Sequence, residues 1–238
     1  MVLQADGNSA MILAAGMGTR LKPLTNSKPK ALVEWEGVPL LERIILKLKS
    51  HGFTRIIVNV HHYAEMIVDY VQSRDRFGIQ IEFSHEKEKL LDNGGGIAHA
   101  AWFLKDEPFL VYNVDVNCSI DLRALYKAHL EGGAIVTMAV KERVTSRSLL
   151  MNKEEFLGGW RDNRTGETIL TGDGTEDLYP IAFSAVHVMN PEVFELFPRE
   201  EIFPLMPFYL ELAKSHPIKL YRHDQDTWTD MGKLESYA

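Results

Sequence analysis

Hydrophobic residues in the first half of the chain alternate between two spacings. Short apolar runs, which are typical of buried strands, occupy residues 11–15, 56–60, 109–112 and 134–140, and residues 79–83 alternate between apolar and polar as in a strand. Apolar side chains three and four positions apart, as on one face of a helix, occur at residues 40–50, 64–74, 96–104 and 122–129. Strands that alternate with helices predict a parallel sheet covered by helices on both faces.

The pattern changes after residue 140, where this half is predicted to be more antiparallel. Short strand-like runs occur at 147–151 and 156–160, turn signals at 163–166 and 171–174, and a long strand at 181–188. A helix start at 190–191, a second helix at 205–214, and a final strand and turn at 218–221 and 228–232 follow. No internal repeat or Pro/Ser-rich linker divides the chain. We therefore expect one α/β domain over residues 1–238, with a mixed, mostly parallel sheet.

Composition and charge narrow the classes of partner. The 238 residues include 26 Lys and Arg against 33 Asp and Glu, which gives a formal net charge of -7. This acidic balance argues against nucleic acid or an anionic membrane as partner. The one cysteine, Cys118, excludes an intramolecular disulfide and a multi-cysteine zinc site. Because the sequence also shows neither a secretion signal nor a membrane-spanning run, it predicts a cytoplasmic protein.

A glycine loop follows the first predicted strand, in the segment MILAAGMGTRLKPLTNSKPKALV at residues 11–33. Gly16 and Gly18 free main-chain amides to point at a phosphate, and Arg20 and Lys30 add positive charge. The segment is not a GxxxxGK[ST] loop, and the third glycine of GxGxxG would have to be Leu21. By itself, a GxG turn fits an ordinary strand connection as well as a phosphate site.

Two further features suggest chemistry without proving it. Asp115 follows the strand at 109–112, so it is expected at the carboxyl edge of the sheet, where it could bind a cation or only cap the next helix. The glycines at 94–96 would let a flat base lie on the main chain, but a tight turn explains them equally well. Asp230, which lies near Asp224 and Asp226, is by composition part of a solvated acidic run.

Taken together, five short segments resemble the sugar-1-phosphate nucleotidyltransferases. LAAGMGTR at 13–20, LKPLT at 21–25 and KPKAL at 28–32 match that family's signature LAAGxGTRLxPLT with its Lys-Pro-rich extension. LLDNGGGIA at 90–98 is similar to the family's second nucleotide loop, and WTDMG at 228–232 to its W-x-D-x-G segment. The resemblance implies a Rossmann-like fold of the nucleotide-diphospho-sugar transferase type. It further implies an N-terminal extension at 1–9, a nucleotide-binding half at about 10–140 and a sugar-binding half at about 141–238.

The resemblance also implies the roles of individual residues. Arg20 and Lys30 would contact phosphates and act in catalysis. Asp115 and Asp230 would bind Mg²⁺. Nucleotide binding would involve Leu13, Ala14, Ala15, Gly16, Gly18, Thr19, Arg20, Lys30, Asn93, Gly94, Gly95 and Asn113.

At three positions the chain departs from the family pattern. Val114 replaces a glycine and is expected to narrow the room beside the nucleotide, Ala185 replaces the glycine of an FSGI segment, and Asn93 stands where threonine is common. Among the branches, the chain is most similar to N-acetylmuramate-1-phosphate uridylyltransferases. Mannose- or heptose-1-phosphate guanylyltransferase and glucose-1-phosphate thymidylyltransferase are the enzyme alternatives, and a non-catalytic nucleotide-sugar-binding regulator is the alternative of a different class.

The expected partners are therefore a nucleoside triphosphate and a sugar 1-phosphate, bound by a monomer or small homo-oligomer. Polar or aromatic residues of the second half that could contact the sugar are Ser146, Arg147, Trp160, Glu176 and Asp177. His61 and His62 follow an apolar strand, and because no other metal ligand has suitable spacing, we expect them to be hydrogen-bonded loop histidines.

Overall fold

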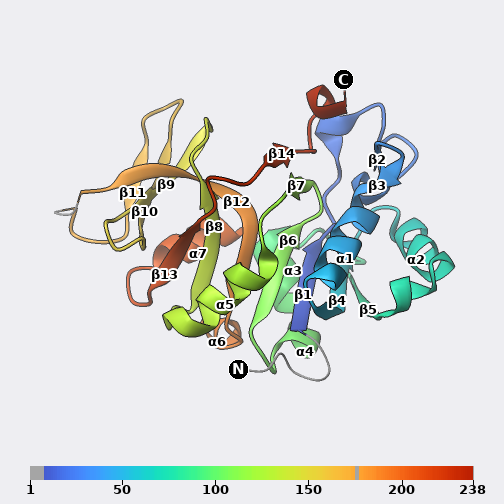
Figure 1. Ribbon diagram of the computed structural model, residues 1–238, viewed down its shortest axis with the longest axis horizontal. Coiled ribbons are helices and arrows are strands. Elements are labelled where there is room, and N and C mark those ends of the chain that lie inside the picture. Colours follow the sequence, from blue (N-terminus) through green and yellow to red (C-terminus); the bar gives the residue numbers. More distant parts are fainter. Residues whose placement is uncertain (1–7, 175–176, 238) are drawn as a thin grey trace.

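A ten-stranded mixed sheet forms the centre of the computed structural model, which describes residues 8–174 and 177–237 (Figure 1). In spatial order the strands are β11 (Thr168–Leu170), β10 (Leu157–Asp162), β9 (Arg147–Met151), β12 (Tyr179–Met189), β6 (Phe109–Asn113), β1 (Asn8–Leu13), β4 (Phe53–Val60) and β5 (Gln80–His85). β8 (Val136–Lys141) pairs with β12, and β13 (Ile218–Arg222) pairs with β8. Two small ribbons pair β2 (Glu34–Trp35) with β3 (Val38–Pro39) and β7 (Val116–Cys118) with β14 (Trp228–Asp230).

Helices cover both faces of this sheet. They are α1 (Leu40–Ser50), α2 (Ala64–Ser73), α3 (Asp92–His99), α4 (Ala101–Leu104), α5 (Leu122–Gly132), α6 (Val193–Leu196) and α7 (Leu205–Leu212). Successive residues of a strand point to opposite faces, and β1 shows the result: Ala10 and Ile12 pack in the core with α1, α2 and α5, whereas Met11 packs in the core with α3, α4, α6 and α7. Within the described residues, none of these helices has the length and apolarity to cross a bilayer.

The predicted fold class is confirmed. β5, β4, β1 and β6 run parallel to one another, as the alternation of strands and helices indicated. β12 runs antiparallel to both β6 and β8 and separates them, and β9, β10 and β11 form an antiparallel extension. The predicted helix at 40–50 and strand at 147–151 have the same bounds as α1 and β9. The short elements β2, β3, β7 and β11 were missed because two or three residues carry no readable period.

The start of the helix predicted at 96–104 was wrong, because the glycine triplet lies inside α3. Glycine has low helix propensity, but here close packing favours it. A Cβ on Gly94 would lie 2.3 Å from Cε2 of Phe203, and a Cβ on Gly95 would lie 2.2 Å from the carbonyl oxygen of Glu201. The first turn of the helix is also capped, since the amides of Gly94 and Gly95 donate to the Phe203 carbonyl at 3.0 and 3.3 Å.

The N-terminal boundary also differs from the prediction. β1 begins at Asn8, so residues 8 and 9 of the predicted extension at 1–9 belong to the sheet, and residues 1–7 lie outside the described residues.

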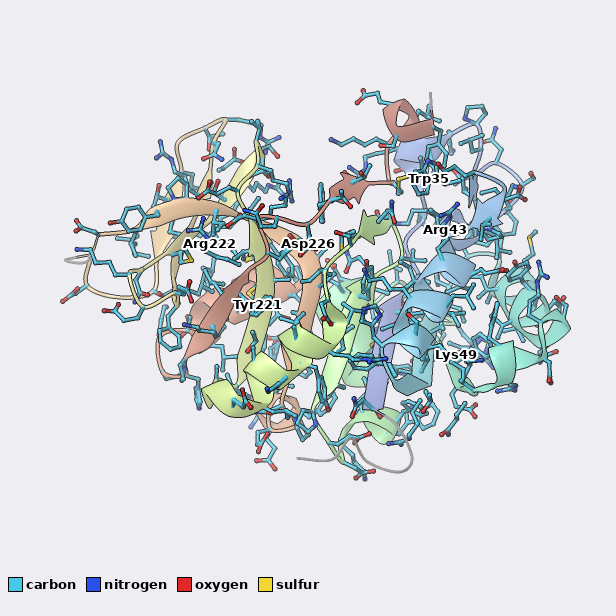
Figure 2. The ribbon with its side chains drawn as sticks, viewed as in Figure 1. Trp35, Arg43, Lys49, Tyr221, Arg222 and Asp226 are labelled. Atoms are coloured by element: carbon cyan, nitrogen blue, oxygen red, sulfur yellow. The ribbon has the colours of Figure 1, made fainter. Side chains whose placement is uncertain are left out.

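Arg43 of α1 holds the β2–β3 ribbon against that helix. Its guanidinium lies 4.5 Å from the ring centroid of Trp35, and Nη2 donates to the Trp35 carbonyl at 2.6 Å (Figure 2).

Ala185 lies at an irregularity of β12, where the pairing with β8 shifts register between Phe183 and His187. Its φ is 57°, a left-handed conformation that glycine adopts without strain. We expect Ala185→Gly to raise the free energy of unfolding by about 0.5–1 kcal/mol, because relief of the strain exceeds the added entropy of the unfolded chain. Urea denaturation measures this. Ala182→Gly in the same strand is the control and should lower the stability, and a loss of stability in Ala185→Gly would contradict the account.

His187 is fully buried, and neither ring nitrogen has a hydrogen-bond partner among the described residues. Burial lowers its pKa from 6.5 to about 3. Below pH 6.5 the unfolded chain therefore binds a proton at His187, whereas the folded chain keeps the ring neutral down to about pH 3. The free energy of unfolding consequently falls by about 1.4 kcal/mol per pH unit as pH decreases from 6.5 towards 3. We expect His187→Leu to flatten the pH dependence of unfolding in this window, whereas His99→Leu, at an exposed position, should leave it unchanged.

Candidate active site

The carboxyl ends of three adjacent strands define the site. Leu13, the last residue of β1, is in register with Asn59 of β4 on one side and Asn113 of β6 on the other. The chain leaves the sheet just beyond this row, so the following loops meet above it. A cavity of about 170 Å³ lies there, lined by Leu13, Ala15, Gly16, Lys30, Asn59, Leu90, Asp92, Asn93, Asn113 and Asp115. Seven of these were predicted site residues: Leu13, Ala15, Gly16, Lys30, Asn93, Asn113 and Asp115.

The glycine loop folds back on itself so that Lys30 returns to the cavity. Gly18 has φ 62°, its carbonyl accepts from Oγ1 of Thr25 at 2.8 Å, and a Cβ there would lie 2.9 Å from Cγ2 of Thr25. Glycine is therefore needed at this turn on both conformational and steric grounds. Thr19 and Arg20 belong to the 3₁₀ turn that follows, and these two residues and Gly18 do not line the cavity.

Lys30 and Asp115 form an ion pair inside the cavity, with 2.9 Å between Nζ and Oδ2. The exposed fractions of the two side chains are 14% and 12%, so solvent screens this pair much less than a surface pair. Val114, between Asn113 and Asp115, is fully buried in the core on the α1 side. The expectation that Val114 narrows the cavity was wrong, because consecutive residues at the strand end point in opposite directions.

Asp230 reaches the same place from the C-terminal segment. β14 pairs with β7, which brings Asp230 opposite Val116, and the Met231 amide donates to the Asp115 carbonyl at 2.7 Å. Arg20 Nη1 lies 3.8 Å from Oδ2 of Asp230. A Cβ on Gly232 would lie 2.7 Å from Asp115 Oδ2, 2.9 Å from Asp230 Oδ1 and 2.9 Å from Arg20 Nη2. Two carboxylates and a guanidinium thus converge on one point.

The negative charge of these carboxylates affects a neighbouring tyrosine. Burial, together with the charges of Asp115 and Asp230, raises the pKa of Tyr237 to about 12. The phenol donates to the Met231 carbonyl at 3.0 Å and so fastens the end of the chain to the WTDMG segment.

Arg143 is a site neighbour that the sequence did not indicate. Its guanidinium carbon lies 3.6 Å from the ring centroid of Trp228, and Nη2 donates to the Phe183 carbonyl at 2.7 Å. Burial lowers the pKa of Arg143, and the charge of Asp230 opposes that shift. A lone arginine in a polar loop carries no sequence signal of its own.

Asn59 and Glu86 are two further residues that sequence reasoning missed. Asn59 Oδ1 accepts from the amides of Ala14 and Ala15, and its Nδ2 donates to Glu86, which also accepts from the Leu91 amide. Asn59 could have been noticed as the polar residue in the apolar strand RIIVNV. Glu86 is hidden in the charged run HEKEK and has no such signal.

Three predicted nucleotide-binding residues lie behind the cavity wall. Ala14 has its side chain in the core and its amide bonded to Asn59. Gly94 and Gly95 face the segment at 201–203, as described above, and do not line the cavity. Asn93, in contrast, lines the cavity and also accepts a hydrogen bond from the Leu205 amide at 2.8 Å.

The two carboxylates are the candidates for a metal. Among the described residues no group of three or more His, Cys, Asp and Glu side chains is arranged to hold an ion. Mg²⁺ in nucleotide enzymes commonly uses one or two carboxylates, substrate phosphates and waters, so Asp115 and Asp230 fit this donor set. His61 is a hydrogen-bonded loop histidine as expected, because its Nδ1 bonds to the Glu86 carbonyl at 2.6 Å. His62 lies in the same loop, and its ring lies 3.9 Å from that of Tyr63.

A second cavity, of about 480 Å³, lies between β9, β10, β12 and α7. Two of the predicted sugar contacts, Arg147 and Trp160, line it together with Ser148, Leu149, Ile169, Phe183, Pro204, Met206, Pro207 and Leu210. The two linings are linked through Leu205, which follows Pro204 of this lining and whose amide donates to Asn93 of the other. Ser146 and Asp177 do not line it; Asp177 is exposed and pairs with Lys153 at 2.8 Å. Glu176 lies outside the described residues.

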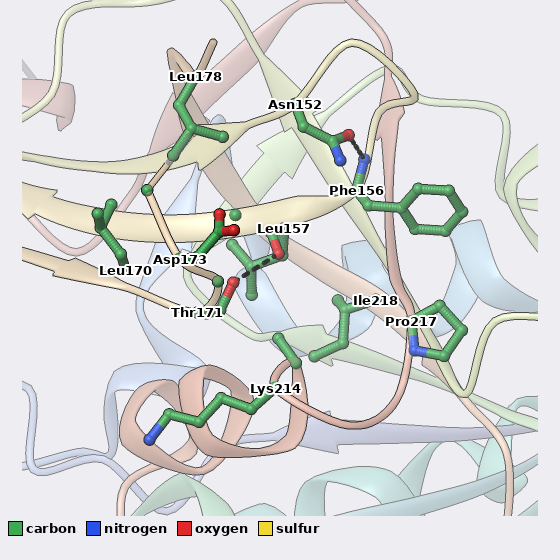
Figure 3. A pocket seen from close by; sticks show the side chains of 14 residues that line it. Asn152, Phe156, Leu157, Leu170, Thr171, Asp173, Leu178, Lys214, Pro217 and Ile218 are labelled. Atoms are coloured by element: carbon green, nitrogen blue, oxygen red, sulfur yellow. Dashed lines mark hydrogen bonds between the residues drawn. The ribbon is translucent and has the colours of Figure 1, made fainter. Parts of the chain in front are cut away.

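A third cavity, of about 350 Å³, lies under the loop at 171–174 and is drawn in Figure 3. Its lining is about as polar as it is apolar: Leu157, Leu170 and Ile218 lie around it together with Asn152, Asp173 and Lys214. Thr171 Oγ1 donates to the Leu157 carbonyl at 3.1 Å and holds the loop over it (Figure 3). No predicted site residue lines this cavity.

Comparison with known proteins identifies relatives of this chain. The chain is 33% identical over 215 residues, 86% of this chain and 84% of the other, to an N-acetylmuramate alpha-1-phosphate uridylyltransferase from Caulobacter vibrioides. It is 41% identical over 138 residues to a mannose-1-phosphate guanyltransferase from Gibberella zeae, covering 56% of this chain and 38% of that protein. In structure it is similar to HddC from Yersinia pseudotuberculosis in complex with GMP-PN, with a TM-score of 0.77, 23% identity and coverage of 97% and 96% of the two chains, a likeness that concerns the fold.

The family comparison covers the glycine loop, strand β6 and Asp115 just beyond its end. Residues 9–148 match the model of the family described as Nucleotidyl transferase. The predicted resemblance to this family is thereby confirmed, and the chain belongs to the nucleotidyl transferase family.

Proposed function

We propose that this protein transfers a nucleotidyl group from a nucleoside triphosphate to a sugar 1-phosphate, with UTP and N-acetylmuramate 1-phosphate or a related hexose 1-phosphate as substrates. The observation that carries the proposal is the convergence of Lys30, Asp115, Asp230 and Arg20 beside the 170 Å³ cavity. Cations suit the triphosphate, and the carboxylates suit a metal that accompanies it. A non-catalytic regulator would have no need for all four groups together.

In the proposed reaction, a phosphate oxygen of the sugar 1-phosphate attacks the α-phosphorus of the triphosphate. The new P–O bond forms as the bond between the α-phosphorus and the bridging oxygen breaks, and pyrophosphate leaves with the electron pair. No general base is required because the attacking phosphate is already an anion at neutral pH. The protein therefore contributes mainly by positioning and by stabilising charge.

The residues divide these tasks between them. Lys30 and Arg20 would hold phosphate oxygens and offset the charge that grows on the leaving pyrophosphate. Gly16 and Gly18 would allow the main chain to approach the phosphates closely. Asp115 and Asp230 would hold Mg²⁺, which when bound supplies Lewis-acid stabilisation to the phosphoryl group. The ion pair with Asp115 would keep the Lys30 side chain in position to bind a phosphate oxygen.

We propose the 480 Å³ cavity as the sugar site, because its lining is linked to that of the first cavity through Leu205. It also contains Arg147 and Trp160, on which a sugar ring could stack. Its other walls are mostly apolar, with Leu149, Phe183 and Met206 among them. An unsubstituted hexose has little use for so much apolar surface, whereas N-acetylmuramate offers an acetyl methyl, a lactyl methyl and a carboxylate for Arg147. This chemistry favours the uridylyltransferase alternative over a mannose-1-phosphate guanylyltransferase. The cytoplasmic location and the monomer or small homo-oligomer stay predictions.

A substrate panel tests the proposed reaction and its specificity. Purified protein with Mg²⁺ is given UTP, GTP, dTTP, CTP or ATP, each with N-acetylmuramate, N-acetylglucosamine, glucose or mannose 1-phosphate, and pyrophosphate release is measured. We expect the highest rate for UTP with N-acetylmuramate 1-phosphate. A highest rate with GTP and mannose 1-phosphate would support the guanylyltransferase instead, and nucleotide binding without pyrophosphate from any pair would support the non-catalytic regulator.

The two carboxylates are tested by Asp115→Asn and Asp230→Asn, which keep the shape of the side chains and remove their charge. Turnover should fall by roughly 100-fold or more, as when one stabilising group is removed from a developing anion, while nucleotide binding is partly retained. Asp69→Asn, an exposed change on α2, is the control. Near wild-type pyrophosphate release by either site variant would contradict the assignment.

A further inference from the structure

A chain of buried hydrogen bonds connects the two loops of the candidate site. Asn59 Oδ1 accepts from the Ala14 amide at 2.6 Å and from the Ala15 amide at 3.3 Å. Asn59 Nδ2 donates to Glu86 Oε1 at 2.7 Å, and Glu86 Oε2 accepts from the Leu91 amide at 2.9 Å. Asn59 and Glu86 are only 3% and 2% exposed, so water cannot replace these bonds cheaply.

This chain of bonds continues the sheet beyond the point where its ladder stops. The pairing of β1 with β4 ends at Leu13 and Asn59, and the next two amides of the loop would otherwise lack acceptors. The Asn59 side chain supplies the acceptor, so it decides where the loop turns away from the sheet. At the other end, the Leu91 amide precedes α3, whose first residues line the cavity.

Glu86 is itself fixed in place, so it can act as a reference point. Its amide donates to the Val60 carbonyl at 2.9 Å, and its carbonyl bonds to His61 Nδ1 at 2.6 Å. Gly96 closes the remaining side, because a Cβ there would lie 2.8 Å from both Asn59 Nδ2 and Glu86 Oε1. The third glycine of the triplet is thus explained by close approach of this hydrogen bond to α3.

The order of donors and acceptors along the chain of bonds allows one arrangement only. Two backbone donors lie at the Ala14 end and one at the Leu91 end, so each end needs an acceptor. Asn59 provides an acceptor and a donor, and the Glu86 carboxylate provides two acceptors. If Asn59 flipped its amide, Nδ2 would face two N–H groups and Oδ1 would face a carboxylate oxygen. The carboxylate therefore holds the Asn59 amide with its oxygen towards the phosphate loop.

From this geometry we propose that Glu86 is a positioning residue for nucleotide binding, which acts through Asn59 and the Leu91 amide to hold the phosphate loop and the start of α3 in one arrangement. Neither side chain is required to take part in the chemistry. The inference deepens the proposed function and rests on it for the substrate, but the hydrogen-bond arrangement itself can be measured in the absence of any substrate.

Two isosteric single substitutions break the order of donors and acceptors. In Glu86→Gln one N–H group must face another N–H group, whichever way the two amides turn. In Asn59→Asp a carboxylate oxygen faces Glu86 Oε1. In each variant we expect the hydrogen exchange of the Ala14 and Ala15 amides to accelerate by roughly 10- to 100-fold. KM for the nucleotide should rise by roughly the same 10- to 100-fold factor, while KM for the sugar 1-phosphate stays within about twofold of the wild type. Glu88→Gln, an exposed change in the same loop, is the matched control.

The double variant Asn59→Asp with Glu86→Gln restores the order and the net charge. The new carboxylate at position 59 would accept from the Ala14 and Ala15 amides and from the new side-chain amide at position 86, whose oxygen would accept from the Leu91 amide. We expect amide exchange and KM for the nucleotide to return to within about threefold of the wild type, since every buried donor again has an acceptor. A merely volume-filling role would show no such rescue.

The outcomes separate this inference from the proposed function. If the single variants leave the exchange of the Ala14 and Ala15 amides unchanged, or if the double variant is as impaired as the singles, the positioning role is overturned. If the wild type releases no pyrophosphate from any substrate pair but the exchange rates show loss and rescue, the proposed reaction fails and the positioning of the loop by Glu86 stands.

Discussion

The pairing of β1 with parallel neighbours on both sides is the constraint on which the site depends. Leu13 is in register with Asn59 and Asn113, so three strands end in one row. Parallel strands end at the same edge of a sheet, and the loops that leave them must cross the same space. The glycine loop, the loop before α3 and Asp115, just beyond the end of β6, are therefore neighbours even though they are far apart in the sequence.

Steric exclusion at glycines then fixes how closely those loops approach. Gly18 permits the turn that returns Lys30 to the cavity, and Gly96 makes room for the bond between Asn59 and Glu86. Gly94 and Gly95 admit the segment at 201–203, which belongs to the second half of the chain. In this structure Gly94 and Gly95 are therefore the points where helix α3 packs against the second half of the chain. For the glycines at 94–96, the absence of a side chain allows this close packing, and their conformational freedom matters less.

The site brings positive side chains together although the molecule as a whole is negatively charged. The chain carries a formal net charge of -7, yet Lys30 and Arg20 approach the two carboxylates beside the cavity. Pairing lowers the cost of burying each charge, and a phosphate or metal could exchange with either partner of a pair. The carboxylate of Glu86 is a different case, because it accepts hydrogen bonds from an amide and a side chain and takes no part in the proposed reaction. In our proposal this carboxylate orients the side-chain amide of Asn59.

The sequence by itself determined much of this protein. The apolar periodicity predicted the layers and most elements, because burial of one strand face or one helix face is a local pattern. The strings around Gly16, Gly18, Lys30, Asp115 and Asp230 indicated the family. What only the tertiary structure decided were contacts between segments that no local pattern relates. β14 aligns Asp230 with Asp115, Val114 turns into the core, and Glu86 reaches Asn59 from the next strand. A residue in a charged run has the same local sequence whether it lies in solvent or in a buried network, and only the fold distinguishes them.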